Sequence, residues 1–346
     1  MPSPYRSSSG QKPRRLLLDG GGDLPPAAMS FFKVWMRGQR HSEFPLTLLL
    51  LPWASEREGH EHIADADVWI APASDCITAV LAPSIAQINA DPAILEATLS
   101  SLHTAHGIFC CGGDQERFMS LLDAHPSLLA ALSASFHAGC PVAGTSAGTA
   151  IMSHTMITGQ DLRNGSPTPP SAPFSAPNPD LTPDPEPWPW GFIEIGRVAT
   201  RRGLGFARGL VCDQHFIRRQ RFNRLLSVLR DPATQERAGL GVDEDAAVCI
   251  EWSRGDGSEP NPNPNRGDGS EPASPATPTP ADAAASVFIG AAGAAGAGGE
   301  VACLRVFASK PSLVAVLVAL EGPEGRDCMR LEVMPANTGR VWTLRL

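Results

Sequence analysis

A serine in a glycine-rich stretch is the first residue of the sequence whose setting suggests chemistry. Ser146 lies in "VAGTSAGTAIM", between Gly144 and Gly148, where an apolar run meets a segment compatible with a helix. On a sharp strand-to-helix turn such a serine is strained and exposed, which suits a nucleophile. The other interpretation is a small polar residue in a turn whose glycines only permit close packing. The pattern alone leaves both open.

A nucleophilic serine also needs donors for the oxyanion that forms during attack. The N–H of Ala147 follows the serine at the expected start of a helix, where backbone N–H groups favour negative charge. Gly112 and Gly113 end the apolar run "GIFCC" and can bring backbone N–H groups against the same oxyanion. Gln115 follows closely and can reach a substrate amide or carboxylate. We therefore expect Gly113 and Ala147 to form an oxyanion hole.

Among the nine histidines, His215 is the strongest candidate for a general base. It follows an apolar run in "LVCDQHF", so Asp213, Gln214 and His215 are expected at the carboxyl edge of a sheet, where open α/β sheets bind ligands. His154 follows the serine segment closely and is a poorer alternative. The histidines of "GHEH" (59–62) are interpreted as surface residues, since no third metal ligand accompanies them. No metal site is predicted.

Three arginines follow the candidate base, in a segment predicted to form a helix over Phe216–Leu229. Arg219 lies near the start of that helix, and Arg221 and Arg224 lie on one flank of it. A solvated basic face is one interpretation. Carboxylate recognition by arginine forks is favoured, because the run begins beside an Asp-Gln-His in an otherwise acidic protein. The residues expected on the buried face are Phe222, Leu225, Leu226 and Leu229.

An acidic turn, "GVDED", precedes the apolar run "AVCIEW". Its carboxylates can orient His215 and stabilise the imidazolium form of that side chain. Ordinary turn acids are the alternative for each residue taken singly. The sequence does not decide which of Asp243, Glu244 and Asp245 reaches the histidine.

The elements that must position these residues alternate between short apolar runs and helical segments, which indicates an α/β fold with a mostly parallel sheet flanked by helices. Strands are expected at "RLLLDG", "LTLLLLP", "ITAVLA", "GIFCCGG", "PVAGTS" and "AVCIEW". Helices are expected over 91–103, with Asp91 as the cap and Pro92 at the first position, and over 116–122, 126–138 and 216–229.

The domain organisation is expected to consist of one catalytic domain with insertions. Residues 1–13 are expected to be a flexible tail, and residues 14–252 the catalytic α/β domain. A proline-rich insertion at 163–190 interrupts that domain, since its proline content excludes helix and central strand. Residues 253–300 have the composition of a low-complexity linker, and the apolar runs of 301–346 are expected to be strands that complete the domain.

Composition excludes several functional classes. The 28 basic and 36 acidic residues leave a net charge of -8, which argues against a general nucleic-acid or anionic-membrane binder. The longest apolar runs are too short to cross a bilayer or to form a signal-peptide core. The eight cysteines form no CxxC pair and lie mostly in apolar runs, as expected of reduced core residues in a cytoplasmic protein.

The motifs "GGDQ", "GTSAG", "DQHF" with its trailing arginines, and "GVDED" together resemble the cyanophycinase family of serine peptidases, the S51 group. The family's fold is similar to that of class I glutamine amidotransferases, a flavodoxin-like three-layer sandwich. The resemblance covers about residues 14–252. It implies that Ser146 is the nucleophile, His215 the general base and acid, and Glu244 the carboxylate that orients the histidine.

The resemblance also implies a substrate and a pocket. Family members hydrolyse cyanophycin, a poly-aspartate backbone with arginine on each β-carboxyl, to β-Asp-Arg dipeptides, so an exopeptidase for β-aspartyl bonds is expected. No metal or organic cofactor is implied. A homodimer is expected, with a peptide or polymer substrate and no nucleic-acid or membrane partner. The substrate pocket would be lined by Gln115, Asp213, Gln214, Arg219, Arg221 and Arg224.

Departures from the family pattern keep other functions open. Thr149 stands where alanine is expected, the segment "VWIAPASDC" matches the family poorly, and both insertions adjoin the candidate site. One alternative is another hydrolase of acidic substrates on the same fold: an aspartyl dipeptidase, an amidase or an esterase. The second is an inactive binding protein whose proline-rich segments dock partners in extended form.

Overall fold

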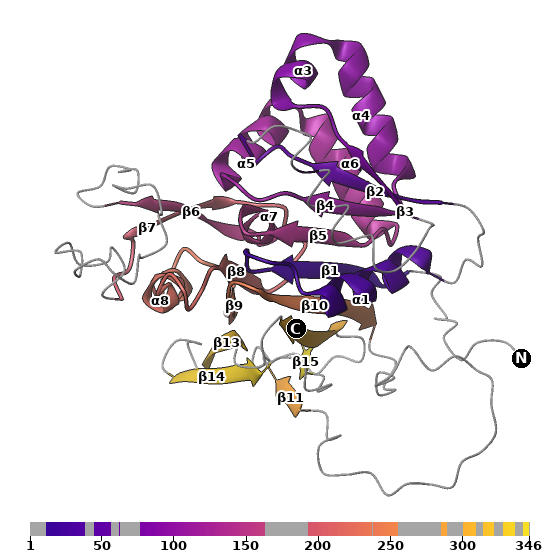
Figure 1. The fold of residues 1–346 in the computed structure, drawn as a ribbon. Helices are drawn as coiled ribbons and strands as arrows, with labels where there is room; N and C mark the ends of the chain where they lie inside the picture. The colour runs from indigo at the N-terminus through magenta and orange to yellow at the C-terminus, as the bar shows by residue number, and fades with distance from the viewer. Residues whose placement is uncertain are drawn as a thin grey trace, which may run out of the picture.

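The structure of the chain is a computed structural model in which strands of the described residues, from distant parts of the sequence, form three sheets (Figure 1). The predicted insertion at 163–190, most of "GHEH", most of the tail at 1–13 and most of the segment at 253–300 lie outside the described residues. The described residues are 12–38, 45–56, 62, 77–162, 193–236, 238–254, 285–288, 300–308, 314–321, 328–335 and 342–345.

Five neighbouring strands of the largest sheet are parallel, and all five were predicted from their apolar runs. Because parallel strands present their carboxyl ends at one edge, "LLLD", "FCCGG" and "AGTS" end close together there. The spatial order is β3 (Ile77–Leu81), β2 (Leu46–Leu51), β4 (Gly107–Cys110), β5 (Val142–Thr145) and β1 (Arg14–Asp19).

The sheet continues beyond β1 with strands of mixed direction. β10 (Ala246–Arg254) pairs antiparallel with β1, and β12 (Glu300–Ala308) pairs antiparallel with β10. β15 (Trp342–Arg345) and β11 (Ala285–Phe288) complete the nine strands. The run "AVCIEW" therefore forms a strand, as expected, and the described strand β11 lies within the segment expected to be a linker.

Helices cover both faces of this sheet, which confirms the predicted α/β class. In β1 Leu16 and Leu18 pack into the core beneath one helical layer, whereas Leu17 packs against α1 on the other face, as the strand period of two requires. The sheet is therefore the middle one of three layers. α1 (Pro26–Arg37) lies on one face; α3 (Ile85–Ala90), α4 (Pro92–Thr104), α5 (Gln115–Ala124) and α6 (Pro126–His137) lie on the other.

The helix starts follow local chemistry. The Asp91 side chain accepts a hydrogen bond from the backbone N–H of Ala93, with Pro92 at the first position of α4, as predicted. α3 was not predicted, although Ser84 and Gln87 form a capping box that the sequence "SIAQ" encodes. Among the described residues, no helix is both long enough and apolar enough to cross a membrane.

The candidate base His215 follows a strand of a second sheet, whereas the site residues were expected at the edge of a single sheet. The second sheet has four strands, of which β8 (Leu210–Gln214) and β9 (Ala238–Val242) are parallel, and β9 leads through the acidic turn into β10 of the large sheet. The turn thus crosses from one sheet to the other. The other two strands are β13 (Val314–Glu321) and β14 (Cys328–Pro335), and a separate pair consists of β6 (Thr155–Asp161) and β7 (Val198–Arg202).

The predicted start of the helix after the candidate base was wrong. α8 spans Phe222–Leu229 and so begins six residues later than expected. His215 and Gln220 have positive φ, 48° and 50°, which a right-handed helix does not allow. The carboxylate of Asp243 accepts the backbone N–H groups of Ile217 and Arg218 and stabilises this turn. The expected apolar face is confirmed, because Leu225, Leu226 and Leu229 are buried and Phe222 packs against them.

Candidate active site

The serine lies on a strained turn between β5 and α7 (Ala147–Ala150). Ser146 has φ 51° and ψ -112°, a conformation that few residues other than glycine adopt. A Cβ on Gly144 would lie 2.2 Å from the carbonyl oxygen of Gly148, and one on Gly148 would lie 2.1 Å from that of Cys110. The glycines therefore do allow close packing, and they do so around a serine held in a strained conformation.

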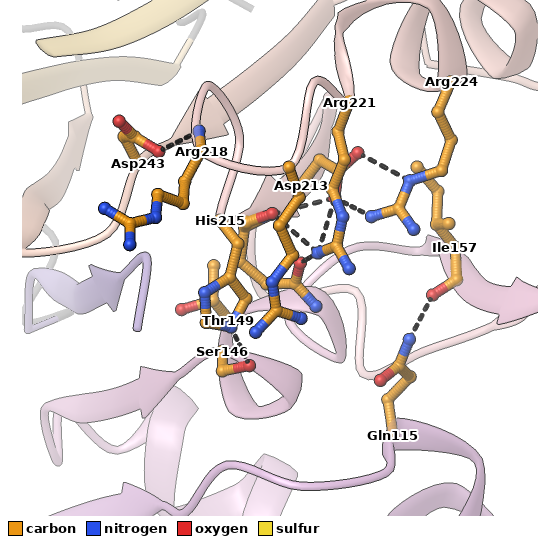
Figure 2. Close-up of polar contacts among 12 residues, drawn as sticks. Gln115, Ser146, Thr149, Ile157, Asp213, His215, Arg218, Arg221, Arg224 and Asp243 are labelled. Carbon is orange, nitrogen blue, oxygen red and sulfur yellow. Dashed lines mark hydrogen bonds and ion pairs between the residues drawn. The ribbon is translucent and has the colours of Figure 1, made fainter. Parts of the chain in front are cut away.

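One continuous line of hydrogen bonds joins Ser146, His215 and Glu244. Figure 2 shows Ser146, His215 and the hydrogen bond between them. Ser146 Oγ lies 2.7 Å from His215 Nε2, and His215 Nδ1 lies 2.7 Å from Glu244 Oε1. With a carboxylate at Nδ1, that nitrogen carries the proton and leaves Nε2 free to accept from the serine. Three residues that are 98 positions apart at most are thus brought together in the order serine, histidine, carboxylate that the sequence predicted.

The alternative base is in a different place. His154 is exposed, packs beside Gly205, and lines a cavity of about 170 Å³ between β7 and α8. The lining of that cavity contains neither Ser146 nor Glu244.

The three acids of the turn have three different partners. Asp243 accepts from the backbone of the turn after His215, whereas Asp245 Oδ1 accepts from the backbone N–H of Asp23. Glu244 is the acid whose carboxylate lies on the histidine ring. Asp245 itself has a positive φ, 58°, immediately before β10 begins.

Burial and positive charge keep the histidine neutral at rest. His215 is buried, and burial is the largest cause that lowers its pKa; Arg219, Arg221 and Arg224 lower the pKa further. A neutral imidazole is the form that can accept a proton from the serine. A carboxylate at Nδ1, here that of Glu244, is the group able to stabilise an imidazolium, because opposite charge favours the charged form.

Two of the arginines are buried behind the histidine. The Arg224 guanidinium binds both carboxylate oxygens of Asp213, and these side chains are 2% and 1% exposed. Arg221 donates to the backbone oxygen of Gln214 and to its side-chain oxygen. The interpretation of a solvated basic face was therefore wrong for these two residues, which form buried polar contacts under the end of β8.

Arg219 and Arg218 lie nearer to solvent around Glu244. Arg219 Nε is 3.7 Å from Glu244 Oε1, and Arg218 Nε is 3.8 Å from Glu244 Oε2. The Arg219 side chain is 26% exposed and that of Arg218 is 55% exposed. Sequence reasoning missed Arg218 as a site residue, although it belongs to the same basic run.

Of the two expected oxyanion donors, Ala147 directly follows the serine, and Gly113 follows a glycine that packs against it. Ala147 occupies the first position of α7, where helix N–H groups have no acceptor within the helix. A Cβ added to Gly112 would lie 3.4 Å from the Cβ of Ser146, so the end of β4 packs directly against the nucleophile turn. Gly113 follows with φ 138°, and a Cβ there would lie 2.1 Å from the carbonyl oxygen of Ala54. Only glycine fits that backbone.

Gln115 begins α5, and its amide nitrogen is committed to β6. Gln115 Nε2 donates to the backbone oxygens of Ile157 and Thr158 at 3.0 and 2.8 Å. Its side-chain oxygen is then the atom able to contact a ligand, and a carbonyl oxygen accepts from N–H groups rather than from carboxylates. Figure 2 shows Gln115 on the same side of Ser146 as Arg221 and Arg224, with Asp243 and Arg218 on the other side.

The described residues contain no group of three or more histidine, cysteine, aspartate or glutamate side chains arranged to hold a metal ion. Burial raises the pKa of the Cys212 thiol to about 12, so this cysteine beside the site is a neutral core residue.

A strained serine on a glycine turn, with a histidine and a glutamate in line on an α/β sheet, has the geometry of serine hydrolases. Residues 45–256 match the model of peptidase family S51, and the chain belongs to this family. The class of the protein is therefore that of a peptidase, and the family resemblance seen in the four motifs is confirmed.

The relatives that the chain matches include cyanophycinases of cyanobacteria. The chain is 32% identical to the cyanophycinase of Trichormus variabilis over 152 residues, 44% of this chain and 41% of the relative. It is 32% identical to the cyanophycinase of Synechococcus elongatus over 156 residues, 45% and 39% respectively. The match spans about two fifths of the length of these curated relatives. A crystal structure of a peptidase from an acI-B1 Actinobacterium superposes with a TM-score of 0.45 at 18% identity, covering 70% of this chain and 88% of that one.

Proposed function

We propose that this protein is a serine exopeptidase of the cyanophycinase type, which releases β-Asp-Arg dipeptides from cyanophycin. The bond it cleaves is then an α-peptide bond of the poly-aspartate backbone and not the expected β-aspartyl bond, because the β-Asp-Arg product keeps its β-aspartyl bond to arginine. The observation that carries the proposal is the continuous hydrogen-bonded line from Ser146 through His215 to Glu244. Membership of peptidase family S51 and similarity to curated cyanophycinases support it.

In the proposed reaction, His215 Nε2 takes the proton of Ser146 Oγ as that oxygen attacks the α-carbonyl carbon of an aspartyl residue in the cyanophycin backbone. The carbonyl oxygen becomes an oxyanion, for which the N–H groups of Ala147 and Gly113 are the proposed donors. The imidazolium returns its proton to the leaving amine, the C–N bond breaks, and an acyl-enzyme remains. Water then attacks the acyl carbon, gives its proton to His215, and Ser146 leaves with that proton.

The polar side chains around the line from Ser146 to Glu244 suit a substrate that carries carboxylate groups as well as a guanidinium. Arg219 is the accessible arginine of the predicted set, so we assign it the substrate carboxylate, with Arg218 beside it. The Gln115 side-chain oxygen suits an amine or guanidinium. The Gln214 and Arg221 side chains contact each other and are proposed to line the inner wall of the pocket.

Asp213 and Arg224 were expected to contact the substrate, and we now propose a supporting role for them. Each is the other's partner and both are almost completely buried, so their charges act on the pocket from behind. In this role they hold β8 and α8 together at the point where His215 leaves the strand.

Incubation of the pure protein with cyanophycin, and separately with α- and β-aspartyl dipeptides, tests the proposal. We expect β-Asp-Arg from cyanophycin, identified by mass spectrometry against synthetic α and β standards. The matched control is Ser146→Ala, which should give no product. Turnover of an α-aspartyl dipeptide, an amide or an ester instead would assign the protein to another hydrolase of acidic substrates. No turnover and no labelling of Ser146 by a fluorophosphonate would favour a binding protein.

A further inference from the structure

A buried aspartate lies directly beneath the nucleophile turn. Asp19 is the last residue of β1, is 0% exposed, and pairs in register with Thr145, the residue before the nucleophile. Sequence reasoning treated it only as the end of an apolar strand. A carboxyl group in such a place must form hydrogen bonds or give up its charge.

The backbone of Asp19 holds the turn that carries Ser146. Its carbonyl oxygen accepts from the backbone N–H of Ser146 at 3.0 Å, and the hydroxyl oxygen of Thr149 lies 2.7 Å from it. The Ser146 N–H is therefore committed to β1, which leaves the following N–H, that of Ala147, as the donor on this turn for an oxyanion.

The side chain of Asp19 connects the nucleophile to the histidine. Asp19 Oδ2 accepts from the hydroxyl of Thr145 at 2.5 Å and from the backbone N–H of Gly21 at 3.2 Å. Gly21 packs against the histidine ring so closely that a Cβ there would lie 2.2 Å from His215 Cε1. The adjacent Gly20 carbonyl accepts from the backbone N–H of His215 at 2.9 Å. Asp19 Oδ2 thus joins the segment of Thr145, which precedes Ser146, to the segment of Gly21, which packs against His215. The distance between these two segments decides whether Ser146 and His215 can form a hydrogen bond.

The second oxygen, Asp19 Oδ1, is buried and has no hydrogen-bond partner among the residues that the structure describes. Burial is the largest cause that raises the pKa of Asp19, to about 7; the hydrogen bonds from Thr145 and Gly21 lower the pKa, and the charges of Asp245 and Asp23 raise it. β5 and α7 contribute the hydroxyls of Thr145 and Thr149, which do not titrate, and His215 lies across Gly21. The group therefore changes charge near neutral pH.

We propose that Asp19 is a positioning residue, whose carboxylate form draws Thr145 and Gly21 together and so sets Ser146 against His215, and whose protonation loosens that arrangement. The inference rests on the proposed role of Ser146 as nucleophile. A hydrogen bond to a charged acceptor is about twice as strong as one to a neutral acceptor, so ionisation tightens both contacts of Oδ2 at once. Because His215 has a pKa held below its ordinary value, its own titration is not expected near pH 7.

The rate at which a fluorophosphonate labels Ser146 measures the alignment of serine and histidine without any assumption about the substrate. In the wild-type protein we expect the second-order labelling rate constant to rise with pH, with its midpoint near pH 7. Asp19→Asn keeps the shape and an acceptor oxygen but is neutral at every pH. We expect this variant to lose the midpoint and to be labelled about tenfold more slowly than wild type at pH 8.5, with similar rates at pH 5.5.

Two further variants move the midpoint in opposite directions if the inference is right. Thr145→Val removes a hydrogen bond that lowers the pKa of Asp19, so the midpoint should move to higher pH. Asp23→Asn is the matched control: it removes an exposed charge that raises the pKa, so the midpoint should move slightly to lower pH with an unchanged rate at high pH. Thr145→Val also keeps the inference testable if Asp19→Asn does not fold.

The outcomes separate this inference from the proposed function. Labelling that persists in Ser146→Ala contradicts the nucleophile assignment itself. Labelling that depends on Ser146 but keeps the wild-type midpoint in Asp19→Asn leaves the nucleophile assignment intact and overturns the role of Asp19. A wild-type rate that does not change between pH 5.5 and 8.5 overturns it as well.

Discussion

The proposed nucleophile and the proposed base are held by two differently built halves of the molecule. The nucleophile half consists of β1, β5 and α7, where Ser146 is fixed by backbone strain, by glycines and by hydrogen bonds to main-chain oxygens. The histidine half consists of β8, β9 and α8, where His215 is surrounded by buried charge: Asp213 with Arg224, and Arg221 with Gln214. Apart from Asp19, the contacts that hold Ser146 are steric or neutral, whereas buried charges surround His215.

This difference teaches which changes each half tolerates. A strained turn requires small neighbours whatever the pH, because the clash of an added Cβ with a backbone oxygen does not depend on charge. Buried charge pairs depend on both members, since removal of one leaves the other desolvated and unmatched. Variants in the two halves should therefore differ in whether they lower activity, stability or both.

The largest effect is expected for Ser146→Ala, which removes the nucleophile and leaves the turn intact. We expect kcat to fall at least about 10⁴-fold, because the loss of a catalytic serine removes the covalent pathway. The midpoint of urea unfolding should stay close to wild type, since alanine has the same backbone preference as serine at this strained position. A fall in stability of several kcal/mol would show instead that the serine hydroxyl is a structural contact.

Glu244→Gln is expected to have the next largest effect and acts in the histidine half. The amide can donate to Nδ1 and so place the imidazole proton on Nε2, where it prevents acceptance from Ser146. We expect kcat to fall about 10²-fold to 10⁴-fold, with little change in stability because the Glu244 side chain is 25% exposed. Asp245→Asn is the matched control at the next acid. Equal losses in both variants would argue against a special role for Glu244.

Asp213→Asn should reduce stability more than any variant of the neutral contacts in the nucleophile half. It leaves the Arg224 guanidinium buried beside a neutral amide, and breaking a buried pair in this way costs about 3–5 kcal/mol. Urea unfolding measures the loss, and Asp213→Leu combined with Arg224→Met should recover most of it. A loss below about 1 kcal/mol would mean that the pair contributes little to holding β8 and α8 together.

Asp19→Asn should stabilise the protein at high pH, which is the opposite sign from Asp213→Asn. The pKa of Asp19 is raised from 3.8 to about 7, so the folded state holds the proton more tightly than the unfolded state. The free energy of unfolding of the wild type then falls as pH rises from 3.8 to about 7. At about 1.4 kcal/mol per pH unit, the total loss is at most about 4 kcal/mol. Unfolding of both proteins at pH 5 and pH 8 checks this: the advantage of the variant should grow with pH.

Thr149→Ala is expected to have the smallest effect, and it restores the alanine expected of the family. The Thr149 hydroxyl is buried and lies 2.7 Å from the carbonyl oxygens of both Asp19 and Gly144. Its removal should cost about 1 kcal/mol of stability and less than tenfold in kcat. A larger loss of activity than of stability would place Thr149 among the residues that align the nucleophile.

Local sequence patterns predicted a structural element correctly where the residues that cause it lie within one short segment. The five parallel strands follow from their apolar runs, α4 follows from Asp91 and Pro92, and the strained turn follows from the glycines around Ser146. The start of α8 was predicted wrongly because the carboxylate of Asp243 stabilises the turn at Ile217 from 26 residues away. A non-local acceptor of this kind leaves no trace in the helical periodicity.

By itself the sequence determined the family, the α/β class and the types of residue available for chemistry, because these depend on short motifs and on the alternation of apolar runs. The tertiary structure alone decided which partners meet. It placed His215 at the end of a strand in a second sheet, selected Glu244 among three adjacent acids, and paired Asp213 with Arg224 inside the protein. It also placed Asp19 beneath Ser146, since hydrogen bonds between neighbouring strands depend on their register and not on proximity in the chain.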